Sequence, residues 1–295
     1  MRIVVYCPSY FVGVSSVFSH GEKLGLFVRE KDRSKIQKSD YLILGALDRS
    51  YDDELLNRAN AVLITSTLGQ MELMGEINAF VGVLSKFKHL KILCGHYDSC
   101  AALSLWIDRR VEYFSYPINI DHMEKDYSKD RPSKIGLFLP NSSRKNILNQ
   151  SSAYFLSWIK LRNIELHTNL EIEGADVVKH TWLPRDKYLN LINSIAFMLH
   201  LTFTESLSYG VIDSINCGSI PIVSRQVSDY FSLPEIITIN NVDSANSIAS
   251  KILELLNESP DSLNSILTEC RFRLKVISEM HNSKLRSLTE TLNLV

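Results

Sequence analysis

The chain has 295 residues and a formal net charge of −1 at pH 7, with 45% hydrophobic and 22% charged residues. This length predicts two domains of about 150 residues each. The composition is that of an ordinary globular protein with enough apolar residues for a core. The near-zero net charge argues against a broad basic surface and gives no support for non-specific nucleic-acid binding, although it is compatible with a local basic groove.

Targeting segments and metal motifs are not evident in the sequence. No apolar run approaches the roughly 20 residues that a membrane-spanning helix needs, and the start of the chain lacks the apolar core and cleavage site of a signal peptide. The five cysteines are scattered and are interpreted as reduced, buried thiols. A D-x-D metal motif is absent. We therefore expect a cytoplasmic protein, at most peripheral to a membrane, without a metal site.

Short apolar runs alternate with helical patterns, which is typical of parallel βαβ units. In the first part of the chain, strands are expected at 3–7, 41–44, 61–65, 91–94 and 111–116, and helices at 15–27 and 71–87. The polar, charged stretch 121–133 is the best linker candidate. After it, strands are expected at 135–139, 164–168, 196–199, 220–224 and 236–239, helices at 150–160, 185–193 and 209–216, and a helical tail at 244–294.

This order of elements predicts an α/β protein of two Rossmann-like parallel-sheet domains, 1–125 and 126–295. The final helix is expected to pack back on the N-terminal domain. Because ligands of open parallel sheets bind beyond the carboxyl ends of the strands, a cleft between the two domains is the expected site.

The segment 203–224 carries the strongest chemical signal. It comprises a strand end, a polar loop with Glu205, a helix, a turn at Gly218 and a buried strand. Ser206 to Ser208 lie near the start of the helix, where free N–H groups and the helix dipole favour an anion such as phosphate. Asp213 lies about two helical turns after Glu205. The spacing alone is equally compatible with two surface carboxylates on an ordinary crossover.

This segment resembles the E-x7-E region of retaining GT-B glycosyltransferases, written E-G-F-G-x-x-x-x-E-A-M-A-C-G-x-P-V-I-A-S. The residues that carry the resemblance are Glu205, Leu207, Cys217, Gly218, Pro221, Ile222, Val223 and Ser224. Ser206 and Ser208 replace two glycines of the family pattern, which narrows the backbone freedom of the loop. Asp213 replaces the second glutamate, which keeps the charge and shortens the reach by one methylene.

The resemblance implies roles for these residues in binding the donor. Glu205 would contact hydroxyls of the donor sugar and stabilise positive charge near the anomeric carbon. Asp213 would accept hydrogen bonds from the ribose. The donor-binding set would be Arg144, Lys145, Leu183, Ser206, Leu207, Ser208 and Asp213.

Three further positions follow from the same resemblance. The segment 180–192, with Leu183, is similar to the loop that approaches the donor base. Lys145 matches a lysine that contacts the diphosphate, but Pro140 stands where the family has an arginine, and Arg144 is the nearest substitute. His96 is similar to the histidine that faces the reacting sugar. Separately, Gly13 could let the backbone approach a substrate.

The resemblance implies metal-independent transfer of a sugar, with retention, from a nucleotide-diphosphate sugar such as a UDP-sugar. The acceptor would be a hydroxyl of a glycan, a lipid-linked sugar or a small molecule, and no other cofactor is expected. A competing hypothesis is a phage-type transferase that acts on a hydroxymethylated base flipped from DNA, with Lys86, Lys88, Arg109 and Arg110 lining the acceptor site. Two more hypotheses are a catalytically weakened nucleotide-sugar-binding protein and a nucleotide-sugar epimerase.

Overall fold

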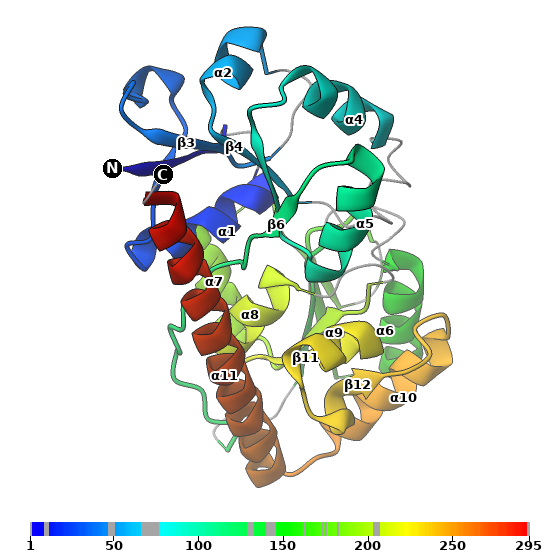
Figure 1. The fold of residues 1–295 in the computed structure, drawn as a ribbon. Helices are drawn as coiled ribbons and strands as arrows, with labels where there is room; N and C mark the ends of the chain where they lie inside the picture. Colours follow the sequence, from blue (N-terminus) through cyan, green and yellow to red (C-terminus); the bar gives the residue numbers. More distant parts are fainter. Residues whose placement is uncertain are drawn as a thin grey trace. The chain divides into compact units, whose positions relative to one another are not determined.

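The computed structural model describes residues 2–8, 12–46, 51–65, 77–128, 133–139, 146–161, 163–172, 174, 176–181, 183–202 and 207–293. The chain forms two compact units (Figure 1). The first unit is Met1–Asn119 with Ser278–Val295, and the second unit is Ile120–Ile277. Each unit contains one six-stranded sheet. The C-terminal helix α11 (Pro260–Asn293) begins in the second unit, and its residues from Ser278 onward belong to the first.

The first unit contains a parallel sheet with the strand order β2-β1-β3-β4-β5-β6. Its strands are β1 (Ile3–Tyr6), β2 (Val28–Glu30), β3 (Tyr41–Leu44), β4 (Ala61–Ile64), β5 (Lys91–Cys94) and β6 (Val111–Tyr113). Its helices, besides the end of α11, are α1 (Val12–Lys23), α2 (Asp53–Arg58), α4 (Ile77–Lys86) and α5 (Tyr97–Ile107). β3 and β4 are buried along their whole length, as expected for parallel strands covered by helices on both faces.

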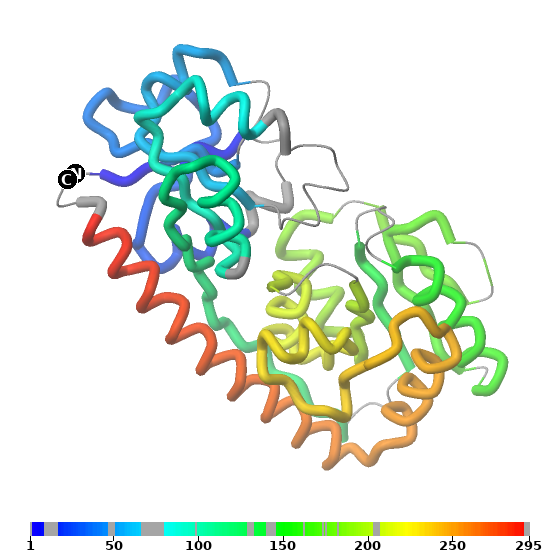
Figure 2. Tube along the Cα trace, turned by 45° about the vertical axis from the view of Figure 1, so that its right-hand side comes forward, coloured from blue at the N-terminus to red at the C-terminus, as the bar shows by residue number. Residues whose placement is uncertain are grey.

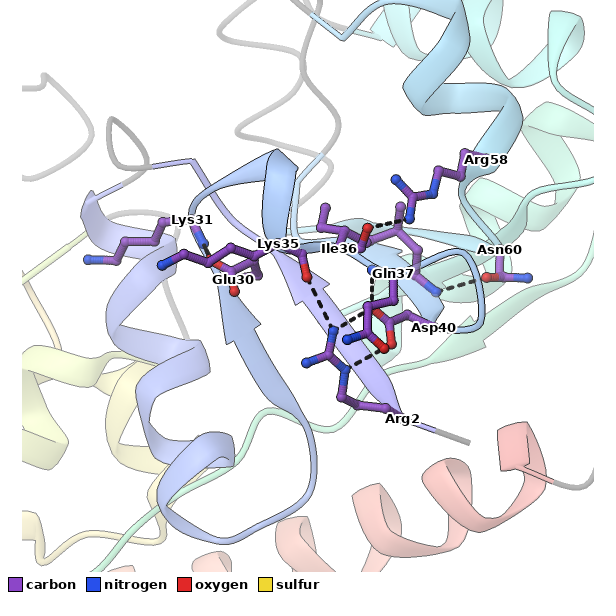
Figure 3. Close-up of polar contacts among 10 residues, drawn as sticks. Arg2, Glu30, Lys31, Lys35, Ile36, Gln37, Asp40, Arg58 and Asn60 are labelled. Carbon is purple, nitrogen blue, oxygen red and sulfur yellow. Dashed lines mark hydrogen bonds and ion pairs between the residues drawn. The ribbon is translucent and has the colours of Figure 1, made fainter.

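A charged contact fixes the start of two strands in this sheet. Arg2, which precedes β1, donates from Nε and Nη2 to the carboxylate of Asp40 at 2.8 and 2.6 Å (Figure 3). The backbone N–H of Gln37 donates to the same carboxylate at 2.7 Å. The hydrogen bonds from Arg2 hold the pKa of Asp40 below its ordinary value. Because Asp40 directly precedes β3, the contact supports the pairing of β1 with β3.

The predicted helix 15–27 is wrong at its C-terminal end. α1 ends at Lys23, and Gly25 adopts a positive φ of 68°, a conformation that ends helices and favours glycine. The chain then turns back, so that the ring of Phe27 covers Gly21 and packs edge-on against Phe18. The residues that follow form the edge strand β2, which the sequence analysis did not predict.

The second unit contains a parallel sheet with the strand order β12-β11-β10-β7-β8-β9. Its strands are β7 (Lys134–Leu137), β8 (Glu165–Thr168), β9 (Val177–Lys179), β10 (Phe197–His200), β11 (Ile220–Ser224) and β12 (Thr238–Ile239). Its helices, besides the start of α11, are α6 (Ile147–Leu161), α7 (Arg185–Ser194), α8 (Tyr209–Asn216), α9 (Arg225–Phe231) and α10 (Ala245–Leu256). α10 packs along α6 (Figure 2).

Several expected boundaries differ from the structure. The strand expected at 236–239 is a short 3-10 helix, Glu235–Ile237, followed by the two-residue strand β12. The strand expected at 111–116 ends at Tyr113. The helices α5 and α9 and the edge strand β9 were not predicted. Among the helices that the structure describes, none combines the length and the apolar character that a membrane crossing requires.

Candidate functional site

The crossover from β10 through α8 to β11 lies in the middle of the second sheet and carries the E-x7-E-like segment. β10 and β11 pair in parallel, and every residue of both strands is buried. α8 is buried from Val211 through Asn216. Because burying an unpaired polar group is costly, the polar side chains of such a helix must find partners within the protein or in a ligand.

Asp213 lies on α8 and has only 4% of its surface exposed. Its two carboxylate oxygens accept hydrogen bonds from Nη1 and Nη2 of Arg185, each at 2.5 Å. This is a bidentate ion pair, the geometry in which a guanidinium binds a carboxylate most specifically. The predicted site residue Asp213 therefore has a partner within the protein that the sequence analysis did not name.

Arg185 is the first residue of α7, directly after Pro184. A cation at this end of a helix opposes the helix dipole, so the local sequence does not explain its position. Burial alone would lower the pKa of Arg185, but the hydrogen bonds and charge of Asp213 outweigh it and leave the pKa raised. The guanidinium also lies 5.8 Å from the ring centre of Tyr188. About 45% of the Arg185 side chain is exposed, so solvent or a ligand can reach it.

Ser208 precedes the first turn of α8 and is buried. Its hydroxyl forms no capping bond to the helix, and it is instead hydrogen-bonded to Nε2 of His200, the last residue of β10. Gly210 lies against the same imidazole, because a Cβ added there would come within 3.1 Å of its ring. The serine that replaces a family glycine is thus held at the strand end by a histidine, and Leu207 beside it is buried.

Gly218 forms the turn between α8 and β11. Its φ is +80°, and an added Cβ would lie 2.4 Å from the Cβ of Lys125. The hydroxyl of Tyr127 binds the carbonyls of Ala196 and Gly218, at 2.8 and 3.0 Å. These contacts fix the chain just before β10 and just before β11. The C-G pair of the motif therefore has a structural role in this turn.

An aromatic cluster lies at the strand ends before α7. Phe138, which follows β7, has its ring centre 5.9 Å from that of Tyr188 and 5.8 Å from that of His180. Nδ1 of His167 lies 3.0 Å from Nε2 of His180. Burial lowers the pKa of both histidines, and the hydrogen bond that His167 donates to the Glu165 carboxylate opposes this effect at His167. Leu183 shortly precedes α7 in the chain and is half-buried.

The remaining predicted site residues fall into two groups. Glu205, Ser206, Arg144 and Lys145 lie outside the described residues, as does Pro140. His96 and Gly13 belong to the first unit. His96 precedes α5, where its Nε2 donates to the carbonyl of Thr65 at 3.0 Å. Gly13 lies in the first turn of α1.

Three of the four basic residues proposed to line a DNA site have partners within the first unit. Arg109 donates to the carbonyls of Leu84 and Lys88, at 2.8 and 2.9 Å. Lys86 is paired with Asp53 at 2.6 Å, and Arg110 lies 3.4 Å from Glu112. Arg109 therefore ties α4 to the loop before β5, and the charges of the other two cations are balanced by neighbouring acids.

Arg185 and His200 are the site residues that the sequence analysis missed. A signal for Arg185 was present, because a basic residue at the first position of a helix is unfavourable without a partner. For His200 the signal is weaker, because a histidine at the end of a buried strand does not by itself indicate a site. Within the part of the chain that the structure describes, no three His, Cys, Asp or Glu side chains gather in a way that could hold a metal ion.

No sequence family and no curated relative matches this chain. Solved structures do match it. A UDP-forming α,α-trehalose-phosphate synthase from Burkholderia vietnamiensis has a TM-score of 0.60 at 7% identity, over 97% of this chain and 100% of that chain. A trehalose-6-phosphate structure from E. coli, bound with UDP-2-fluoro glucose, has a TM-score of 0.59 at 10% identity, over 93% of this chain and 76% of that chain.

A third structure, the corresponding synthase from Burkholderia xenovorans in complex with glucose-6-phosphate, has a TM-score of 0.59 at 8% identity, over 93% of this chain and 76% of that chain. At such low identity these similarities establish the fold. The predicted fold class is confirmed: the chain has two Rossmann-like parallel-sheet domains with a C-terminal helix, as in GT-B proteins.

Proposed function

We propose that this protein is a retaining glycosyltransferase that moves a sugar from a nucleotide-diphosphate sugar to a hydroxyl of a small acceptor. One observation carries the proposal. The E-x7-E-like segment lies on the β10–α8–β11 crossover, in the middle of the second sheet of a GT-B fold, and its second acidic residue is buried in an ion pair with a half-exposed arginine. Ligands of such sheets bind at the carboxyl ends of the strands, where this crossover begins.

Each part of the proposed donor meets a group of matching chemistry. Glu205 would contact hydroxyls of the sugar and stabilise the positive charge that develops at the anomeric carbon as the diphosphate leaves. The diphosphate would lie at the start of α8, near Leu207 and Ser208, where the helix dipole favours an anion. Arg144 and Lys145 would offset the charge that builds on the leaving group. None of these steps calls for a metal ion.

The nucleoside would lie between α7 and α8. Asp213 would accept hydrogen bonds from the ribose, and the base would lie by Leu183. A UDP-sugar is the favoured donor because the matching E. coli structure is bound with UDP-2-fluoro glucose. A sugar phosphate is a reasonable first acceptor to test, because the Burkholderia xenovorans synthase is in complex with glucose-6-phosphate. His96, in the first unit, is the candidate to face the transferred sugar.

The hypothesis of a DNA acceptor gains no support. Three of the four cations suggested for it, Lys86, Arg109 and Arg110, are engaged by carbonyls and acids of the first unit. The two matching Burkholderia structures described above are UDP-forming α,α-trehalose-phosphate synthases. Sugar transfer to a small acceptor is therefore the function that the site supports best.

A thermal-shift screen against UDP, GDP, ADP and their glucose conjugates tests the donor site. Because a ligand that binds only the folded state stabilises it, we expect one nucleoside diphosphate to raise the melting temperature at about 1 mM. Release of that diphosphate from its sugar in the presence of a sugar phosphate would support transfer. Binding without release would identify a nucleotide-sugar-binding protein, and a product formed without any acceptor would identify an epimerase or hydrolase. Absence of any binding would contradict the proposal.

A further inference from the structure

Cys94 and Cys100 form a pair of thiols around the turn that carries His96. Cys94 ends β5, and Cys100 lies near the start of α5, with five residues between them in the chain. Four of the five cysteines are at most 1% exposed, as the sequence analysis expected, whereas Cys100 is only partly buried. Of the five thiols, that of Cys100 is therefore the most accessible to a reagent in solvent.

The sulfur atoms of this pair lie beside the same backbone oxygen. Sγ of Cys94 and Sγ of Cys100 lie 3.5 and 3.4 Å from the carbonyl oxygen of His96. A hydrogen bond with Cys100 is also the main cause that raises the pKa of the Cys94 thiol above its ordinary value. The two thiols are therefore in contact in the reduced protein, and one sulfur can attack the other once that one is oxidised.

The two thiols have different surroundings, which suit two different steps. Cys100 is the fourth residue of α5, where the positive end of the helix dipole favours a negative charge such as a thiolate. Cys94 belongs to the buried core of the first unit, and its sulfur accepts the backbone N–H of His96 at 3.4 Å. A small oxidant in solvent therefore reaches Cys100 first, and Cys94 is placed to react with the product.

The turn between the two cysteines is fixed by its packing. The backbone N–H of Gly95 donates to the carbonyl of Ile64 at 3.1 Å, and a Cβ added to Gly95 would lie 2.0 Å from the ring of Tyr116. Nε2 of His96 lies 3.0 Å from the carbonyl oxygen of Thr65. These contacts hold the segment that joins the two cysteines, so the approach of the two sulfurs is built into the fold.

We propose that Cys94 and Cys100 are an oxidation site that reacts with hydrogen peroxide to form a disulfide. The Cys100 thiolate attacks one peroxide oxygen, the O–O bond breaks, and Cys100 becomes a sulfenic acid as hydroxide leaves. The sulfur of Cys94 then displaces the hydroxyl group of the sulfenic acid and forms the S–S bond. The two thiol protons and the two peroxide oxygens leave as water, and two electrons pass from the sulfurs to the peroxide.

The disulfide would change the turn that carries His96. Oxidation removes both S–H donors from the carbonyl of His96, which keeps the N–H of Ser99 at 3.0 Å. A dithiol reductant would restore both thiols by exchange. The inference does not depend on the proposed function, because it concerns two side chains of the first unit and a reagent from solvent.

Peroxide treatment of the reduced protein tests the inference. After treatment the protein is unfolded, its remaining thiols are alkylated with N-ethylmaleimide, and its tryptic peptides are weighed by mass spectrometry. Both cysteines of the pair lie in the tryptic peptide 92–109. We expect this peptide to escape alkylation and to be about 2 Da lighter than its reduced form. Cys7, Cys217 and Cys270 should be alkylated, and dithiothreitol should restore alkylation of the pair.

Two variants separate the two steps, and a third is the control. In Cys94→Ser the sulfenic acid of Cys100 has no thiol to react with, so dimedone, a reagent for sulfenic acids, should label Cys100 at least about fivefold more than in the wild-type protein. In Cys100→Ser, Cys94 should stay reduced. Cys270→Ser removes a buried cysteine of the second unit and should leave the yield of the disulfide unchanged.

Three results would overturn the inference. The first is a wild-type protein that keeps both thiols of the pair after peroxide treatment. The second is oxidation of Cys7, Cys217 or Cys270 at the same rate as the pair, because this would show general oxidation of an opened chain. The third is a folded Cys100→Ser protein in which Cys94 is oxidised as fast as in the wild-type protein.

Discussion

Replacing His281 by asparagine should flatten the acid side of the stability profile. His281 lies on the part of α11 that belongs to the first unit, and only 2% of its surface is exposed. Its Nδ1 lies 3.1 Å from the carbonyl oxygen of Tyr116, so this nitrogen carries the proton of a neutral imidazole. The amide nitrogen of asparagine can donate the same hydrogen bond without an ionisable ring.

The magnitude follows from the pKa of this histidine. Burial lowers the pKa of His281 from 6.5 to about 4, against the opposing effect of the Tyr116 carbonyl. Between these two values the unfolded chain binds a proton that the folded protein does not. Above pH 6.5 the neutral His281 therefore causes no loss of unfolding free energy. As the pH falls from 6.5 to about 4, the unfolding free energy decreases by about 1.4 kcal/mol per pH unit and about 3 kcal/mol in all.

Urea unfolding followed by circular dichroism at pH 7.5, 6.5, 5.5 and 4.5 measures this loss. The difference in unfolding free energy between His281→Asn and the wild-type protein should change in favour of the variant as the pH falls. The matched control is His89→Asn, which removes an exposed histidine of the same unit. Parallel pH profiles for the wild-type protein and His281→Asn would refute the reasoning, as would an equal change in the control.

Three other perturbations test the structure of the second unit and the chemistry. Gly218→Ala should cost about 1–3 kcal/mol of unfolding free energy, because of its positive φ and the contact with Lys125, whereas Gly82→Ala in α4, with open space around it, should be neutral or stabilising. Tyr127→Phe should cost about 1–2 kcal/mol, since the carbonyls of Ala196 and Gly218 lose the hydrogen bonds of the Tyr127 hydroxyl; an unchanged urea midpoint would contradict this. Removal of divalent metal ions with EDTA should leave the transfer rate unchanged, and a loss restored by Mg²⁺ or Mn²⁺ would show a metal requirement.

The sequence predicted the central strands and the site crossover well. β3, β5, α8 and β11 have the predicted bounds. The three strands are short apolar runs, and α8 lies between polar residues on one side and the turn at Gly218 on the other. The edge strands β2 and β9 were missed because each has only three residues and exposed positions, so it carries no periodic signal. The helix α5 was missed because its apolar residues do not gather on one face.

Only the site residues that belong to the sequence motif could be predicted. Segment 203–224 identified Asp213 and Ser208 as residues of interest, but a motif does not state which side chains bind them. Arg185 and His200 come from other elements of the second unit, and their contacts with α8 depend on how α7 and β10 pack. Long-range pairing of this kind is set by tertiary structure, which a single sequence does not display.

Turnover by a Glu205 variant is the most direct test of the central claim. The wild-type protein and Glu205→Gln are each incubated with the nucleotide sugar selected by the thermal-shift screen and a panel of sugar phosphates, and release of the nucleoside diphosphate is recorded. Glu171→Gln, which removes an exposed carboxylate of the second unit, is the control. We expect turnover by the wild-type protein and the control, and at least a hundredfold loss in Glu205→Gln with its melting temperature retained. Equal turnover in Glu205→Gln, or none in the wild-type protein, would contradict the account.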